Sequence, residues 1–328
     1  MRGAPNKFKR LGRAKRPSTA IGLAFLGSVG LGGCRPSAEL PTVSVENGSL
    51  VQLELTYSRD LLPGAPARLE AEAHFVRYRA TDRTFDKTRV AGLLGLGTDA
   101  NLPLDSCRVD DQAPTAAAGA LEVALLDAGT LTVRTGIATG SSTGFSTEAI
   151  LEPHHYPELL PFVSGVVYGL EAAPAHEIVP STRVEIEANG GEDVGPFVAA
   201  TALPRAFPNL SVARDGAGDL ELRWAALNSA APSPLSIELR WAGARPGALR
   251  CRASDDGRFT VARSLTEGLD AAISAGQSAQ ASVAREERSV FDAPGAGRGE
   301  VIVTLRDVAA LSPAAAGSTP PAAGSTQP

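Results

Sequence analysis

The sequence predicts an all-β protein built from two β-sandwich units of immunoglobulin-like or jelly-roll-like type. Apolar residues alternate with polar ones in many short runs, and this period of two is typical of half-buried strands. Turn-forming residues recur about every ten residues between these runs. Strands do not alternate with long amphipathic helices, so an α/β fold is not expected.

The strand-forming runs extend from residue 49 to residue 305. In the run 69–75 the odd-numbered positions are apolar and the even-numbered ones are Glu70, Glu72 and His74, so these three side chains share a polar face. The residues 127–129 favour a hairpin loop between strands at 121–126 and 130–134. Apolar spacing in 85–96 allows one short helix. Further strands are expected at 49–55, 161–168, 183–187, 197–203, 220–227, 237–241, 249–253, 259–261 and 301–305.

The first 34 residues are divided by charge. Residues 1–16 are basic without any Asp or Glu, and residues 17–34 are uncharged with an apolar centre at 20–26. A basic segment followed by a short apolar one is typical of a secretory signal peptide. A membrane-spanning helix is the alternative, but the glycines in the uncharged run each cost about 1 kcal/mol of helix propensity relative to alanine.

The uncharged run ends in Leu31, Gly32, Gly33 and Cys34, which together resemble the lipobox of bacterial lipoproteins. In that family the cysteine thiol is acylated with diacylglycerol and the peptide bond before it is cut. The resemblance implies that Cys34 is lipidated and tethers the mature chain to a membrane. Arg35 stands where an Asp would retain a lipoprotein at the inner membrane, which favours the outer membrane. The alternative is an ordinary signal peptide with an unrelated cysteine.

These features predict the domain organisation. A signal peptide at 1–33 is followed by a lipid anchor and spacer at 34–47, a β-rich unit at 48–178, a β-sandwich unit at 179–308 and a tail at 309–328. The tail is rich in Pro, Ala, Gly, Ser and Thr and is expected to be disordered. Residues 186–197 consist of a strand, a Gly-Gly turn with two acidic residues, and a Phe that begins the next strand. This segment resembles uncharacterised extracellular sandwich domains of secreted bacterial proteins. That resemblance implies a fold and no activity.

The exported part of the chain is acidic. Seven of the 31 Lys and Arg residues and none of the 36 Asp and Glu residues lie in the signal, which leaves 24 basic against 36 acidic side chains and a net charge of about −12. Such a surface disfavours nucleic acid and anionic lipid as partners. Besides the membrane anchor, the expected partner is an unidentified protein or glycan.

The cysteines of the body form an even pair. With Cys34 assigned to lipid, Cys107 and Cys251 are the two that are left, in an exported and oxidising setting. A disulfide between them would be worth about 5 kcal/mol on the chain-entropy model. The alternative is two separate buried thiols, since free cysteine packs well as a small apolar residue.

One segment matches a catalytic motif. Residues 140–144 fit the G-x-S-x-G nucleophile elbow, with Ser142 as the nucleophile. The elbow needs a buried strand before it and a helix after it, whereas 135–146 is polar and glycine-rich, so a flexible loop is expected. The enzymatic alternative is a secreted serine hydrolase that uses Ser142 with His154 or His176.

The other polar clusters favour structural interpretations. His154, His155, Glu158, His176 and Glu177 lack a metal-ligand spacing and are interpreted as exposed loop residues rather than a metal site. The acidic loops at 110–111, 192–193, 215–219 and 255–256 lack calcium-binding spacing and are typical of tight turns.

The two tryptophans lie at matching places in neighbouring strands. Trp224 and Trp241 both occupy the apolar face of their strand, so core packing is expected in preference to a sugar-stacking platform. No catalytic, metal or cofactor residues are expected. The sequence therefore predicts a non-catalytic binding or structural lipoprotein of the cell envelope, with a serine hydrolase or a carbohydrate-binding or adhesion module as alternatives.

Overall fold

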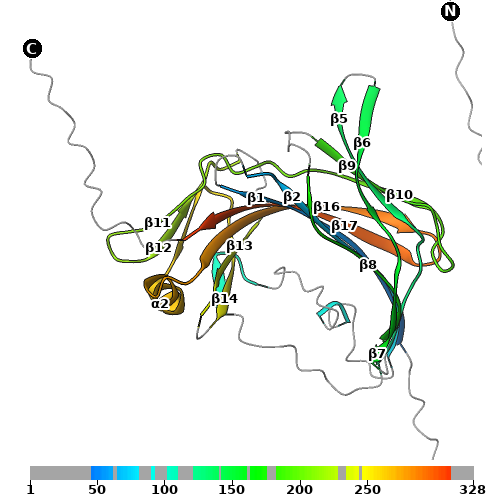
Figure 1. The fold of residues 1–328 in the computed structure, drawn as a ribbon, viewed down its shortest axis with the longest axis horizontal. Helices are drawn as coiled ribbons and strands as arrows, with labels where there is room; N and C mark the ends of the chain where they lie inside the picture. The colour runs from blue at the N-terminus through cyan, green and yellow to red at the C-terminus, as the bar shows by residue number, and fades with distance from the viewer. Residues whose placement is uncertain are drawn as a thin grey trace, which may run out of the picture. The chain divides into compact units, whose positions relative to one another are not determined.

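The protein is described here by a computed structural model that covers residues 46–61, 65–80, 90–92, 102–109, 121–139, 142–160, 163–175, 182–227, 234–243 and 246–311. Strands dominate these residues, which confirms the all-β fold class (Figure 1). The strands are β1 (Glu46–Asp60), β2 (Arg68–Ala80), β3 (Ser106–Val109), β4 (Leu121–Leu125), β5 (Leu131–Thr139), β6 (Ser142–Leu151), β7 (His154–Leu160), β8 (Val163–Pro174), β9 (Thr182–Ala188), β10 (Phe197–Ala202), β11 (Ser211–Arg214), β12 (Leu220–Arg223), β13 (Leu235–Trp241), β14 (Gly247–Ala253), β15 (Arg258–Val261), β16 (Ala279–Ala293) and β17 (Gly297–Ala310).

Helical structure is sparse in this part of the chain. A 3₁₀ turn spans Arg263–Leu265, the helix α2 spans Glu267–Ser274, and residues 90–92 are helical within the segment where a short helix is expected. None of the helices among the described residues is long and apolar enough to cross a membrane. The predicted signal peptide, the spacer up to residue 45 and residues 312–328 of the predicted tail lie outside the described residues.

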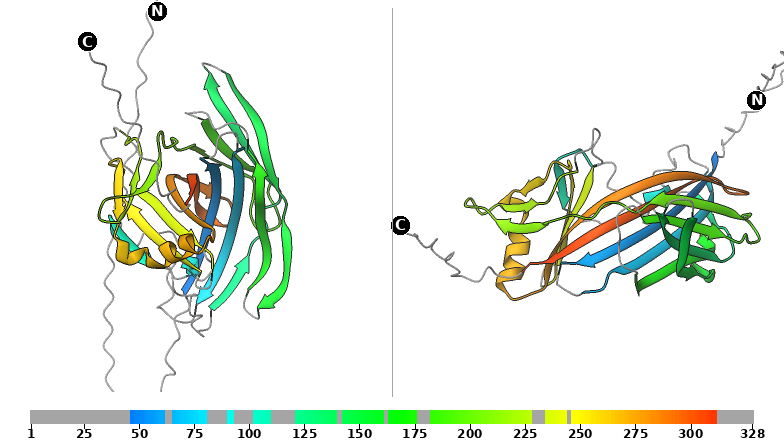
Figure 2. Two further views of the ribbon diagram at one scale, coloured as in Figure 1. Left: turned by 60° about the vertical axis from the view of Figure 1, so that its left-hand side comes forward. Right: turned by 90° about the horizontal axis from the view of Figure 1, so that it is seen from above.

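The strands form three sheets. The longest has the order β3-β14-β13-β16-β17-β1-β2-β4-β8-β7, the second has the order β10-β9-β5-β6, and the third has the order β11-β12-β15. The first strand and the last described strand, β1 and β17, pair in parallel at the middle of the long sheet. Figure 2 shows the green strands of the second sheet facing the blue strands β1 and β2.

Two hydrophobic cores fill the spaces between the long sheet and the smaller ones. The first core joins the odd-numbered residues of β1 and β2 to β5, β6, β9 and β10. The second core joins β13, β14 and the beginning of β16 to β12, β15 and α2. We call the face of the long sheet that carries these residues the inner face, and the opposite face the outer face. The largest fully buried side chains are Tyr168, Phe75, Phe207, Leu53, Leu55, Leu69, Leu131, Leu222, Leu235, Ile237 and Leu239.

The division between the cores differs from the expected boundary at residues 178 and 179. Both β9 and β10 belong to the first core, and the second core begins at Phe207. The long strands β16 and β17 run past both, as the orange ribbons in Figure 1 show. Strands from the two expected units therefore pair within the same sheets, because alternation along the sequence marks strands but does not identify their partners.

The expected hairpin between 121–126 and 130–134 does not form. The strand β4 pairs with β2 and β8, whereas β5 pairs with β6 and β9 in the other sheet. The intervening residues turn between sheets: Asp127 O accepts hydrogen bonds from the N–H groups of Asp193 (3.1 Å) and Val194 (2.9 Å), and Gly129 has a φ of 71°. This positive φ favours glycine.

A buried ion pair lies on the inner face between the two cores. Arg285 of β16 and Asp255 have side chains that are 4% and 2% exposed, and the guanidinium lies 4.0 Å from the ring centroid of Phe207. All five guanidinium N–H groups have acceptors, so the charge is compensated although it is buried. The acceptors are Asp255 Oδ2 (3.0 Å), Asp255 Oδ1 (3.0 Å), Ala206 O (2.8 Å), Arg205 O (3.0 Å) and Ala225 O (3.4 Å).

Candidate functional site

A groove of about 820 Å³ lies on the outer face of the long sheet, over β2, β8 and the start of β7. The even-numbered residues Glu70, Glu72 and His74 of β2 line it, as their alternation with the buried residues of that strand predicts. Its size is within the range of small-molecule sites. Acidic and imidazole groups from three strands therefore face one hollow.

The groove is hollow because the middle of β8 has a glycine. Gly169 lies directly opposite Glu72 in the sheet, and a Cβ added at Gly169 would meet no atom within 4 Å. On either side of it along β8, Val167 and Glu171 also line the groove. A side chain at position 169 would occupy the space between the two strands' outer residues.

The carboxylates at this site differ in their environments. Glu72 Oε2 lies 3.4 Å from Nε2 of His74, and this hydrogen bond holds the pKa of Glu72 below its usual value, despite an opposing contribution from burial. Glu54 lies directly opposite Glu72 on β1 and is half-buried. Burial raises the pKa of Glu54, and the charges of Glu72 and Glu286 add to this, whereas the hydrogen bond from Gln52 and the charge of His74 lower it.

Replacing Glu54 with glutamine is expected to stabilise the protein at neutral pH. A carboxyl group with a raised folded-state pKa destabilises the fold when it is ionised, so stability increases as the pH falls through that pKa. The glutamine variant lacks this charge and its oxygen can still accept the bond from Gln52. We expect the Tm to rise by about 3 °C at pH 7.5.

Thermal unfolding of Glu54→Gln and wild type at pH 7.5 and at pH 3.5 measures this effect. The difference should disappear at pH 3.5, where the wild-type carboxyl is protonated in both the folded and unfolded states. Glu171→Gln is the matched control, since Glu171 is an exposed carboxylate of the same face. A lower Tm for Glu54→Gln at pH 7.5 would contradict the prediction.

The histidine and acid cluster of the sequence is only partly brought together. His154 pairs with Val167 and lies in the groove, whereas His155 pairs with Val166, whose side chain is buried, and therefore lies on the opposite face. His176 and Glu177 are outside the described residues, and for Glu158 only the backbone is described. No group of three or more His, Cys, Asp or Glu side chains in the described ranges is placed to hold a metal ion.

No pattern in the sequence connects His154 with the polar face of β2. The two are joined through β8, which pairs with β2 on one side and with β7 on the other. The alternation in 69–75 identifies Glu70, Glu72 and His74, but no sequence signal indicates that Gly169 lies beside them. Only the structure shows that β8 lies between β2 and β7 and brings these residues together.

The backbone at Ser142 differs from a nucleophile elbow. Ser142 begins β6 and pairs with Thr139 of β5, so a strand follows it where the elbow requires a helix. The expected flexible loop at 135–146 is therefore wrong, because residues 135–139 end β5 and residues 142–146 begin β6, and the two segments pair with each other. Residues 140 and 141 lie outside the described residues.

Three of the acidic loops are turns or internal contacts. Asp215 Oδ1 accepts hydrogen bonds from the N–H groups of Ala217 (2.9 Å) and Asp219 (3.0 Å), and Asp193 Oδ2 accepts one from the N–H of Asp127 (3.0 Å). Asp255 is part of the buried ion pair. The loop at 110–111 lies outside the described residues.

The two tryptophans are in different environments. Trp224 is buried, and its Nε1 donates to Asp255 Oδ1 at 2.7 Å, so it belongs to the core. Trp241 is half-buried beside Gly247 and Gly268, and it lines a second groove of about 630 Å³ at the end of the long sheet. They therefore do not form a common stacking platform.

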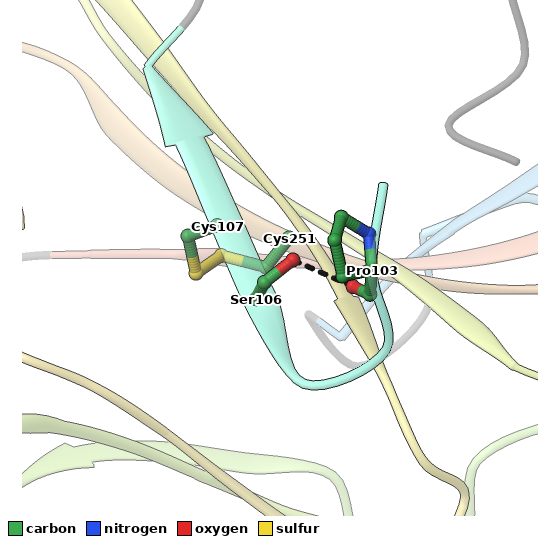
Figure 3. Close-up of a disulfide and its surroundings, with 4 residues drawn as sticks. All are labelled: Pro103, Ser106, Cys107 and Cys251. Atoms are coloured by element: carbon green, nitrogen blue, oxygen red, sulfur yellow. Dashed lines mark hydrogen bonds between the residues drawn. A yellow bond between two sulfur atoms is a disulfide. The ribbon is translucent and has the colours of Figure 1, made fainter. Parts of the chain in front are cut away.

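Cys107 of β3 and Cys251 of β14 form a disulfide across 144 residues of sequence (Figure 3). The two residues are direct partners in the antiparallel pair, and Cys251 is fully buried. Beside the disulfide, Ser106 Oγ donates to Pro103 O at 2.6 Å, which closes the turn that precedes β3. The disulfide joins this short edge strand covalently to β14, its neighbour in the long sheet.

Comparisons of the chain with protein-family models, with curated proteins and with solved structures find no match.

Proposed function

We propose that this chain is exported and anchored to the bacterial cell envelope, with outer-membrane placement favoured, through a lipid on Cys34, and that its β-sandwich body has a non-catalytic binding or structural role there. The supporting sequence features are the basic and apolar segments before Leu31 to Cys34. The anchor holds the body close to a membrane that its own acidic surface does not attract.

The disulfide is the observation that carries this proposal. It uses two of the three cysteines of the chain, so Cys34 is the one cysteine outside the pair. Structural disulfides persist in oxidising compartments such as the periplasm or the cell surface, and are rare in the cytosol. A single further cysteine immediately after an apolar segment is then well explained as the acylation site.

Replacing Cys34 with alanine should leave the protein unacylated and with residues 1–33 still attached. Without the thiol, diacylglycerol cannot be attached and the cleavage that depends on it does not occur. Fractionation of cells, phase partitioning in detergent and mass spectrometry of the N-terminal peptide measure the outcome. We expect an acylated peptide beginning at Cys34 in the wild-type protein and no such peptide in the variant.

Ser37→Ala is the matched control, because it changes the spacer and leaves residues 31–34 intact. It should fractionate with membranes as wild type does. A wild-type protein that is unacylated and found in the soluble fraction would refute the anchor.

A further inference from the structure

We propose that the groove over Gly169 binds a small organic cation of the polyamine class, with its ammonium groups against Glu70, Glu72 and Glu171. This inference rests on the binding role proposed above and is independent of the lipid anchor. It follows from which side chains line the groove, from the space above Gly169 and from the charge of the surrounding face.

The described residues that line the groove carry three carboxylates and two imidazoles, and they include no lysine or arginine. The charged groups come from separate strands: Glu70 and Glu72 from β2, and Glu171 from β8. Glu72 is 64% exposed, so its carboxylate is accessible to a solute. A hollow lined in this way attracts positive charge and repels anions.

The residues of neighbouring strands on the same face do not add an uncompensated positive charge. Glu54 lies next to Glu72 across β1, and further along that row Arg288 is paired with Glu286 (2.7 Å) and Glu300 (3.4 Å). The arginine charge is therefore already compensated within the face. The nearest arginine along β2 is Arg68, which lies beyond Glu70 at the start of the strand.

The arrangement suits an extended cation better than a single metal ion. The described groups are not placed to coordinate a metal together, and the groove volume of about 820 Å³ fits a molecule with several non-hydrogen atoms. Val167, on the same face of β8 as Glu171, supplies apolar contact beside the carboxylates. Methylene segments between ammonium groups match this alternation of charge and apolar surface.

Calorimetric titration of the purified full-length protein with spermidine tests the proposal. Spermidine should bind in low salt and at least about tenfold more weakly in 0.5 M NaCl, because exposed ion pairs are screened. The variant Gly169→Val fills the floor of the groove and should reduce affinity by about tenfold or more. The backbone at Gly169 is not in the positive-φ region and a Cβ meets open space, so the variant should fold.

Gly144→Val is the matched control, since Gly144 also lies in a strand with open space around its Cβ and is far from the groove in the pairing order. It should bind spermidine as wild type does. The double variant Glu70→Gln, Glu171→Gln keeps the glycine floor and should also lose binding. No binding by wild type, or spermidine affinity as high as that of wild type in Gly169→Val or in the double variant, would overturn the inference. Neither result alters the acylation and cleavage at Cys34, so the two proposals fail separately.

Discussion

Replacing Arg285 with methionine is expected to lower the free energy of unfolding by about 3–5 kcal/mol. The substitution leaves the Asp255 carboxylate buried and still bonded to Trp224, but without its cation. It also leaves the carbonyl oxygens of Arg205 and Ala206 without their donor. Both losses act at the place where the two cores meet, so the effect exceeds that of an ordinary surface substitution.

Denaturant unfolding followed by circular dichroism measures this loss. Arg288→Met is the matched control, because Arg288 also belongs to β16 and pairs with carboxylates but is 33% exposed. A partly exposed pair contributes about 1 kcal/mol or less. Equal losses for the two variants would show that burial of the Arg285 pair does not set its contribution.

Removing the disulfide with the double variant Cys107→Ala, Cys251→Ala is expected to cost about 5 kcal/mol, because the bond closes a loop of 144 residues. The loss arises mainly in the unfolded chain, which regains the freedom that the cross-link removes. The short strand β3 would then be attached to β14 by main-chain bonds and by the contacts of Asp105 with Ser254. Unfolding in denaturant, with and without reductant, measures the difference.

Ser106→Ala serves as the control for this variant, since it removes one exposed hydrogen bond next to the disulfide and should cost less than about 1 kcal/mol. Reduction of the wild-type protein should reproduce the effect of the double variant. A double variant as stable as the oxidised wild type would contradict the prediction.

The strands that were predicted from sequence are those with one buried and one exposed face. In β9, for example, Val184 and Ile186 are buried and alternate with more exposed residues. In contrast, the sequence pattern does not predict β16, because its middle residues 286–290 are polar or exposed where the strand passes from one core to the other. The periodicity of such a strand is interrupted although its backbone pairing is continuous.

The candidate site, too, can be predicted from the sequence only in part. Alternation in β2 places Glu70, Glu72 and His74 on one face, which the structure confirms. The groove itself depends on Gly169, about a hundred residues later, and a glycine in a strand does not reveal its neighbours. Sequence patterns report the local face of each strand, whereas a site between strands depends on non-local pairing.

The parallel pairing of β1 with β17 affects how the protein can acquire its structure. Arg59 of β1 forms a bidentate ion pair with the buried Asp307 of β17, and these residues are 248 positions apart. Contacts of such separation form slowly, because the chain between them must first lose its freedom. A chain that emerges from a ribosome or translocon N-terminus first would expose the edge of β1 until β17 follows. Completion of the sheet is therefore a late event, and the growing chain needs protection against pairing with other strands in the meantime.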